Sequence, residues 1–460
     1  MKLSPLVAAA GLIVLALGGY GLQRTDAMAR IAAAYKAKTF CSEVFLAGRD
    51  PVDIASVEFA GISPFIDRAA AHVDRKKKEA RASLFGLGKA RAFYREGYGC
   101  TIASGVPEEL PPPPRVADVP WPEALESPNL LRRVDYAELD NALDAAFADA
   151  SAGHRAVVLI VDGRLVAERY APGFSADTPM LSWSMAKSVT ATLVGAAALA
   201  GHLNVEDPAP VPEWKDDPER SKITWNDLLR MQTGLEFSEE YGDPTSDVSH
   251  MLFRASDAGL VAAEKKLAAA PGDVWAYSSG TTNLLIRTLR QVLAERGVEL
   301  QTFAREKIFA PIGAASFTLE PDSAGTPVGS SYVYATARDW AKLGELYLRG
   351  GEWAGARLLP ENWSRYASTP TRASGGQYGA HFWLNLDGAG RKRFVPGLPE
   401  SVYYMAGHEG QYVFIMPEKN AVIVRLGMTR GAVPIEVAGP VAARLAGAIG
   451  DLPLAEAADE

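Results

Sequence analysis

The sequence has no excess of positive charge. Its 460 residues include 47 Lys and Arg against 55 Asp and Glu, a formal net charge of −8. The chain therefore lacks the basic field that DNA- or RNA-binding proteins use, which argues against nucleic acid as a partner. It also lacks low-complexity tracts and internal repeats, and 48% of its residues are apolar, as in globular proteins. This length exceeds one ordinary core and predicts two or three folded units.

Cysteine is scarce: Cys41 and Cys100 are the only two in the chain. Both precede a proline-rich stretch, and the long remainder has none. A pair confined to one small segment predicts a single disulfide formed in an oxidising compartment. Two buried free thiols are the alternative. A metal site is disfavoured because His72 is the only histidine between residues 30 and 105.

Only one long hydrophobic run occurs, from Pro5 to Leu22. Lys2 precedes it and charge returns at Arg24, which predicts a targeting segment over residues 1–29. The length fits either a cleaved secretory signal or a retained membrane anchor, and a buried helix is a third reading. The first two readings both predict an exported protein, periplasmic or otherwise extracytoplasmic, with possible attachment to the inner membrane through the N-terminal helix.

Composition divides the part of the chain after residue 29 into three segments: a small module, a linker and a large domain. Residues 30–105 form a small module that opens with an alanine-rich helix over 28–38 and carries a basic run from Arg75 to Lys78. We interpret this run as a solvated helix face, or as a contact with anionic lipid in an anchored chain. Prolines make residues 106–129 a stiff linker. Residues 130–455 form the large domain.

The large domain begins and ends with strands. Two strand-like runs flank Asp162-Gly163, a strong hairpin signal, and three more precede a C-terminal helix. The strands are expected over 156–161, 165–170, 402–406, 412–416 and 421–426, the last helix over 435–449, and further helices between 185 and 347. This order predicts a mixed α/β (α+β) fold, in which one antiparallel sheet made from both ends is flanked by helices and joined to a mostly helical lobe. A site would lie in the cleft between sheet and lobe.

Ser184-Met185-Ala186-Lys187 is the only Ser-x-x-Lys in the chain. It opens a run of small and apolar residues without charge, so the helix must be buried nearly all round. Ser184 and Lys187, three residues apart, would share one helix face, and burial favours the neutral amine that can accept a proton. A snorkelling lysine beside a capping serine is the alternative. Gly-x-Ser-x-Gly is absent, which excludes the nucleophile elbow of α/β-hydrolases.

Two further motifs carry candidate site residues. Tyr277-Ser278-Ser279 lies at an expected loop-to-helix boundary, where the Tyr277 hydroxyl could share or pass on a proton. A tyrosine that caps the core is the alternative. His408-Glu409-Gly410-Gln411 lies between two expected strands, where the glycines let backbone approach a ligand and the Gln411 amide could donate to an oxyanion. The alternative for His408 is a structural histidine.

Together the motifs Ser-x-x-Lys, Tyr-x-Ser and His-x-Gly resemble the three signatures of serine β-lactamases and penicillin-binding proteins. Their order and spacing are most similar to class C β-lactamases and to their esterase, amidase and 6-aminohexanoate-dimer hydrolase relatives, over residues 130–450. The resemblance implies a β-lactamase/transpeptidase-like fold and a serine hydrolase without metal or organic cofactor.

The resemblance also implies roles for individual residues. Ser184 would be acylated, with Lys187 and Tyr277 as its base pair, and the amides of Ser184 and Gln411 would hold the oxyanion. His408 would line the far wall, and Ser279 and Gly410 would also belong to the substrate-binding site. Two more residues, Tyr241 and Asp247, would belong to a loop over the substrate.

Departures from the class C pattern bear on the substrate. Ser279 stands where those enzymes carry asparagine, and His408-Glu409 where they carry lysine-threonine. The chain thus lacks a side-chain amide for a substrate carbonyl and a fixed cation for a β-lactam carboxylate. Hydrolysis of an ester or a small linear amide, through an acyl-enzyme, is therefore the favoured function. A β-lactamase or D-Ala-directed peptidase and a non-catalytic penicillin-binding-like sensor are the alternatives.

Overall fold

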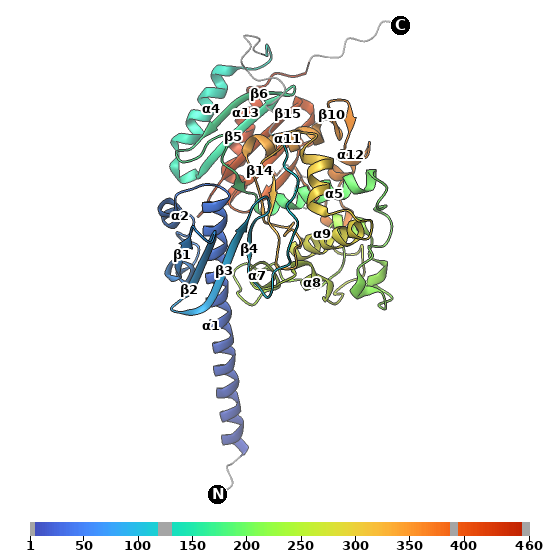
Figure 1. The fold of residues 1–460 in the computed structure, drawn as a ribbon. Coiled ribbons are helices and arrows are strands. Elements are labelled where there is room, and N and C mark those ends of the chain that lie inside the picture. Colours follow the sequence, from blue (N-terminus) through green and yellow to red (C-terminus); the bar gives the residue numbers. More distant parts are fainter. Residues whose placement is uncertain (1–4, 118–130, 387–393, 453–460) are drawn as a thin grey trace. The chain divides into compact units, whose positions relative to one another are not determined.

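The computed structural model describes residues 5–117, 131–386 and 394–452, with side chains from Arg24 onward. These residues form two compact units (Figure 1). Of the described residues, the first unit contains 5–110, 237–261 and 321–325, and the second contains the others. The division at residues 110 and 111 falls inside the stretch that we predicted to be a linker. The two inserted segments, in contrast, were assigned to the large domain from the sequence.

The first unit is built on helix α1 (Pro5–Phe45) and an antiparallel sheet of order β1-β2-β3-β4. Its other elements are α2 (Pro51–Val57), α3 (Pro64–Arg68), β1 (Ala70–Asp74), β2 (Glu79–Leu84), β3 (Leu87–Arg95), β4 (Gly99–Ile102) and α7 (Asp247–Phe253). Ala80, Ala82 and Leu84 alternate along β2 and are buried in the cluster that includes α1, because side chains alternate across a strand. The boundary expected at residue 29 lies inside α1.

The basic run was assigned wrongly to a helix. Arg75–Lys78 form the turn between β1 and β2. The Asp74 carboxylate accepts from the backbone N–H groups of Lys76 and Lys77 at 3.0 and 3.1 Å, and Lys78 has a φ of +50°. An aspartate that satisfies the amides two and three residues on is a local turn signal, which the charge of the run obscured.

The predicted disulfide is confirmed. Cys41 on α1 and Cys100 on β4 are joined, with their Cα atoms 6.0 Å apart. Both are fully buried in the apolar cluster between α1 and the sheet. The bond closes the module across a sequence separation of 59 residues, and it indicates an extracytoplasmic compartment.

The inserted segments join the first unit through specific contacts. The ring of Phe253, at the end of α7, packs against that of Tyr35 on α1, with centroids 5.7 Å apart. Ser323 accepts from the backbone N–H of Ser104 through its Oγ at 3.0 Å, and its carbonyl accepts from the N–H of Glu108 at 2.8 Å. These long-range pairs have no counterpart in local sequence patterns.

The second unit contains the expected antiparallel sheet. In the described part of this unit six strands follow the order β12-β13-β14-β15-β5-β6. The strands are β5 (His154–Val161), β6 (Arg164–Tyr170), β12 (Trp383–Leu384), β13 (Tyr403–Gly407), β14 (Gln411–Met416) and β15 (Ala421–Gly427). Because β15 pairs with β5, both ends of the domain meet in one sheet, and Asp162-Gly163 form the predicted β5–β6 hairpin.

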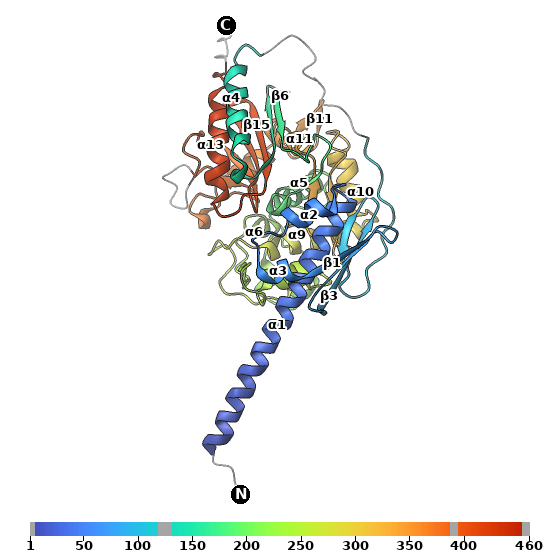
Figure 2. The same cartoon turned by 90° about the vertical axis from the view of Figure 1, so that its left-hand side faces the viewer.

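Helices cover both faces of this sheet (Figure 2). On one face α4 (Tyr136–Ala148) and α13 (Pro434–Gly447) enclose a core with β5, β14 and β15. On the other face lies α11 (Ala337–Leu348). A Cβ at Gly344 would lie 2.7 Å from Val422 and 2.8 Å from Val413, so α11 packs closely because glycine faces the sheet. The predicted mixed α/β architecture is confirmed.

The remaining elements of the second unit form its mostly helical part. Helix α5 (Ala186–Leu199) is buried along most of its length, as the absence of charge after Lys187 predicts. Around it lie α6 (Trp225–Leu229), α9 (Ser279–Ala294), α10 (Leu300–Ala304), α12 (Trp363–Ser368), the π-helical turn Arg305–Phe309 and a small sheet of β7 (Met180–Leu181), β9 (Val333–Ala335) and β8 (Thr318–Leu319). The hairpin of β10 (Glu352–Trp353) and β11 (Ala356–Arg357) completes the second unit, whereas helix α8 (Ala258–Ala263) begins in the first unit and ends in the second.

The side chains of the apolar run at residues 5–22 lie outside the described part of the chain, although α1 begins at Pro5. Among the residues that are described, no helix combines the length and the apolar character needed to cross a membrane.

Candidate active site

Ser184 lies in a 3₁₀ turn, Trp183–Met185, that leads directly into α5. The backbone N–H of Ser182 donates to the carbonyl of Val333 on β9 at 2.9 Å and anchors the turn. Trp183 has a φ of +46°, a conformation that costs a non-glycine residue roughly 1–3 kcal/mol. The surrounding structure thus holds a strained turn that places Ser184 at the start of a buried helix.

Lys187 lies on the first turn of α5 and is only 1% exposed. Its Nζ donates to Ser184 Oγ at 3.2 Å, to Ser279 Oγ at 2.9 Å and to the carbonyl oxygen of Ser330 at 3.2 Å. Three oxygen acceptors match the three hydrogens of an ammonium group, which is what a cation removed from water requires. The Ser184–Lys187 distance is the one that the Ser-x-x-Lys motif leads us to expect.

Tyr277 lies beside this pair. Its ring centroid is 4.7 Å from Lys187 Nζ, a cation–π contact that orients the lysine. Tyr277 is half-buried and directly precedes the N-cap of α9, where Ser278 Oγ accepts from the backbone N–H of Thr281 at 3.0 Å. The structure therefore brings Ser184, Lys187 and Tyr277 together from the starts of two helices.

Ser279 has a different environment from the one expected for a substrate-binding residue. It is fully buried, and its Oγ accepts from Lys187. Asn283, one turn further along α9, holds the third partner of the lysine: its Oδ1 accepts from the backbone N–H of Ser330 at 3.1 Å and its Nδ2 donates to Ser330 Oγ at 3.0 Å. Sequence reasoning missed Ser330 and Asn283, although the i, i+4 spacing of Ser279 and Asn283 places both on one helix face.

Aromatic rings surround Tyr277. Tyr378 packs edge-on at a centroid distance of 6.0 Å and Trp383, on β12, lies at 5.5 Å. Trp275 contacts the same two rings, at 5.5 and 6.1 Å. Aromatic rings in contact restrict one another's movement. This cluster therefore fixes the position of Tyr277 against the lysine.

His408 lies beside the turn that contains Ser184. Its ring packs edge-on against Trp183, with centroids 5.6 Å apart and an interplanar angle of 87°. The approach depends on Gly407, because a Cβ there would lie 2.1 Å from the carbonyl oxygen of Ser182. The predicted neighbourhood of His408 and Ser184 is therefore present in the second unit.

The turn from His408 to Gln411 is held by side chains. Gln411 Nε2 donates to the carbonyls of His408 at 3.0 Å and Gly427 at 2.5 Å, and its Oε1 accepts from the Gly427 N–H at 3.0 Å. Gly410 has a φ of +93°, and a Cβ there would lie 2.1 Å from Arg425 Nη1. The Gln411 side chain is thus a brace, which leaves its backbone amide as the candidate oxyanion donor.

Arg425 is the second brace of this turn, and sequence reasoning missed it. Its Nη1 donates to the carbonyls of Glu409 at 3.2 Å and Gly410 at 2.7 Å, and its Nε donates to His154 Nδ1 at 3.0 Å. Burial lowers the pKa of Arg425 to about 10. Burial, together with the charge of Arg425, lowers the pKa of His154 to about 4, so His154 is a neutral acceptor at pH 7. A single charge within the apolar strand 421–427 was the available signal.

A buried histidine links three helices of the site. His381 has Nδ1 2.6 Å from the carbonyl oxygen of Leu229 and Nε2 2.9 Å from Thr282 Oγ1, while its own carbonyl accepts from Ser188 Oγ at 2.7 Å. A carbonyl only accepts, so Nδ1 carries the proton. Burial lowers the pKa of His381 to about 3, and the charge of Lys187 acts in the same direction. His381 is therefore a neutral connector between α5, α6 and α9.

Tyr241 and Asp247 belong to the first unit, whereas the residues described so far in this site belong to the second. The Tyr241 hydroxyl donates to Glu239 Oε1 at 3.0 Å, and its side chain is exposed. Asp247 opens α7, and its Oδ2 accepts from the backbone N–H of Ser238 at 2.9 Å. Their proposed part in a substrate loop stays a prediction. Within the described residues, no three His, Cys, Asp or Glu side chains are grouped as metal ligands would be.

A buried Ser-x-x-Lys pair between an antiparallel sheet and a helical part defines the class of serine hydrolases that includes β-lactamases and penicillin-binding proteins. A family model described as Beta-lactamase matches residues 139–448, which is more than half of the chain. The chain therefore belongs to the Beta-lactamase family.

Similar proteins of known name or structure support this family assignment. A 6-aminohexanoate-dimer hydrolase from Paenarthrobacter ureafaciens is 28% identical over 317 residues, covering 63% of this chain and 74% of the relative. A putative 6-aminohexanoate-dimer hydrolase from Bacillus anthracis has a similar structure, with a TM-score of 0.54, 22% identity and coverage of 75% and 89%. A penicillin-binding protein homologue from Pyrococcus abyssi gives a TM-score of 0.52 at 18% identity, covering 68% and 78%. These structures share the fold.

Proposed function

We propose that this protein hydrolyses an ester or a small linear amide through an acyl-enzyme, with Ser184 as the nucleophile. The observation that carries the proposal is the Lys187 Nζ, which is buried and 3.2 Å from Ser184 Oγ. A lysine that is held against a serine hydroxyl and removed from water is an activated arrangement for nucleophilic catalysis.

The proposed reaction has two halves. Ser184 Oγ attacks the substrate carbonyl while its proton passes to the Lys187–Tyr277 pair, in which one of the two groups is deprotonated and can act as the base. The same pair returns that proton to the leaving alcohol or amine, and the acyl group stays on Ser184. Water then attacks the acyl-enzyme, loses a proton to the pair and releases the acid. The backbone amides of Ser184 and Gln411 are the proposed donors to the oxyanion in both halves.

The choice of substrate class rests on the turn after β13. His408 and Glu409 occupy the positions at which class C β-lactamases carry lysine-threonine, whose cation would meet the carboxylate of a β-lactam. Glu409 itself forms an ion pair with Arg430. The relative from Paenarthrobacter ureafaciens is named for hydrolysis of an aminohexanoate dimer, which supports a linear amide as one substrate type. The disulfide supports action outside the cytoplasm.

Labelling with a fluorescent fluorophosphonate tests the proposal. The probe should modify the wild-type protein on the peptide that contains Ser184 and leave Ser184→Ala unlabelled. A label on another serine, or none on the folded wild-type protein, would contradict it and favour a non-catalytic sensor. Nitrocefin separates the other alternative, because a β-lactamase would hydrolyse it faster than a p-nitrophenyl ester.

A further inference from the structure

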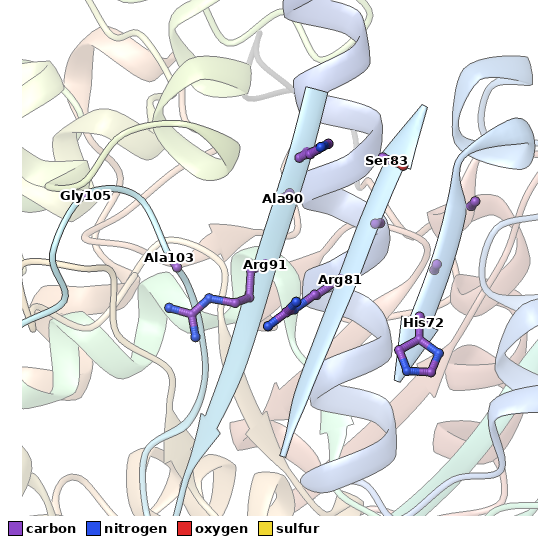
Figure 3. Close-up of a pocket in the computed structure, with 11 residues that line it drawn as sticks. His72, Arg81, Ser83, Ala90, Arg91, Ala103 and Gly105 are labelled. Carbon is purple, nitrogen blue, oxygen red and sulfur yellow. The ribbon is translucent and has the colours of Figure 1, made fainter. Parts of the chain in front are cut away.

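The first unit has a basic hollow that the proposed reaction does not use. It lies on the β1–β3 sheet, has a volume of about 640 Å³, and includes in its lining four basic side chains and no Asp or Glu: His72, Arg81, Lys89 and Arg91. Figure 3 shows His72, Arg81 and Arg91 on one face of the strands, with α1 behind the sheet. The hollow is therefore on the face opposite the apolar core of this unit.

Three of these side chains form a row across three strands. His72 on β1 pairs with Arg81 on β2, and Arg81 pairs with Arg91 on β3. Neighbouring strands lie about 4.8 Å apart, so the row spans about 10 Å. Like charges directly opposite each other destabilise a sheet. Such a row is thus a cost to folding that a ligand of opposite charge would offset.

Glu79 compensates for only part of this charge. Its Oε1 lies 2.6 Å from Arg81 Nη2 and its Oε2 3.3 Å from Arg91 Nη1, and the Glu79 side chain is only 5% exposed. One carboxylate thus orients two guanidinium groups, and each of these has further N–H donors. Lys89 forms no hydrogen bond or ion pair with the rest of the described chain. Two positive charges are therefore offset by a single negative one, and the charge of Lys89 is additional.

Basic character continues past Lys89. A second hollow of about 410 Å³ shares Lys89 with the first and contains Arg30, His250 and Arg254, again without Asp or Glu in its lining. Residues 30–105 contain thirteen Lys and Arg against eight Asp and Glu, whereas the whole chain has a net charge of −8. The positive charge of this acidic protein is thus concentrated in its N-terminal module.

We propose that this face of the first unit binds a small ligand that carries two or more linked phosphate groups. Arginine forks match phosphate oxygens in geometry and charge, and a row of about 10 Å is too long for one phosphate. The hollow is concave, and the basic turn at residues 75–78 is not part of its lining. A molecule that enters the hollow therefore fits better than a flat anionic membrane.

Calorimetry with inorganic tripolyphosphate, at 150 mM salt and with the full chain, tests the proposal. Wild type should bind, and Lys89→Gln should weaken binding about tenfold, because a hydrogen bond to a charged partner is lost. The triple variant Glu79→Gln, Arg81→Gln, Arg91→Gln should abolish binding. This variant removes the carboxylate with its two partners, so no unpaired buried charge is left to unfold the sheet. Circular dichroism and ester hydrolysis should be unchanged in both variants.

Lys76→Gln with Lys77→Gln is the matched control, since it removes two exposed charges outside the hollow. Retained binding in this control supports a defined site, and a loss equal to that of the triple variant would overturn it in favour of diffuse attraction. Absence of tripolyphosphate binding at millimolar concentration would also overturn it. Vesicles of phosphatidylglycerol in phosphatidylcholine distinguish the source of the phosphate: binding to vesicles without binding to tripolyphosphate would assign lipid headgroups in place of a small ligand.

Discussion

Lys187 and Ser279 are joined by a 2.9 Å hydrogen bond that ties the first turn of α5 to the first residue of α9. Where class C β-lactamases carry an asparagine, this chain has a serine that is buried and occupied by the lysine. The residue that was expected to face the substrate instead holds the proposed base. This relationship gives the site a feature that single substitutions can test.

Removal of the proposed nucleophile should abolish turnover. We expect Ser184→Ala to show no hydrolysis of a short p-nitrophenyl ester while its circular dichroism spectrum stays unchanged. Lys187→Ala should lose about as much, since members of a catalytic unit are not additive. Tyr277→Phe should lose less, roughly 10²–10⁴-fold, as expected for a proton-transfer group. Near-normal esterase activity in Ser184→Ala would refute the assignment.

Ser279→Ala should lower kcat by about tenfold to a hundredfold, because a hydrogen bond to a charged group contributes roughly 1.5–3 kcal/mol. KM should change little, since Ser279 is fully buried. Ser278→Ala is the matched control. It removes the N-cap of α9, so it should cost about 1 kcal/mol of stability and affect kcat less. Equal kcat losses in both variants would mean that Ser279 acts only through the stability of the helix.

His381 should make the protein less stable in acid. Its pKa is about 3 in the folded state against about 6.5 when unfolded, so below pH 6.5 the unfolded chain binds a proton that the folded chain does not. Its contribution to the unfolding free energy is therefore present above pH 6.5 and is lost as the pH falls toward 3. The total loss is on the order of 4 kcal/mol.

His381→Asn isolates this effect. Asparagine tolerates the φ of +61° at this position and does not titrate. Urea unfolding at a series of pH values should therefore show a shallower dependence between pH 6.5 and 4 for the variant than for the wild type. Parallel curves for the two proteins would show that His381 titrates normally in the folded state. A histidine NMR titration, in which His381 should stay neutral at pH 5, provides an independent check.

Replacement of the disulfide should loosen the first unit and spare the ester hydrolysis of the second. For the loop between Cys41 and Cys100, the chain-entropy model gives a stabilisation on the order of 4 kcal/mol, and measured values are often smaller. Cys41→Ser with Cys100→Ser should therefore unfold the module at lower urea while ester hydrolysis persists. In the wild-type protein, denaturation without reductant should expose no thiol to alkylation; two alkylated thiols would contradict the bond.

Local patterns predicted much of the fold and the site. Alternation and the Asp162-Gly163 turn were sufficient for five strands of the second unit, β5, β6, β13, β14 and β15, but not for the two- and three-residue strands β7 to β12. The uncharged run after Lys187 was sufficient for α5. Contacts between distant segments could not be predicted from the sequence. Each depends on the tertiary fold, which a short stretch of sequence does not specify. Phe253 against Tyr35 and the Arg425 brace on residues 409–410 are of this kind.

The membership of residues 237–261 in the first unit has a practical consequence for dissecting the protein. A truncation in the proline-rich stretch would remove α1 but keep α7, which lies more than a hundred residues downstream. Phe253 would then lose the ring of Tyr35 and expose an apolar surface to water. A fragment that begins near residue 111 should therefore aggregate. Separate expression of the hydrolase part therefore requires a redesigned α7 surface. Otherwise the N-terminal residues that pack against α7 must be kept.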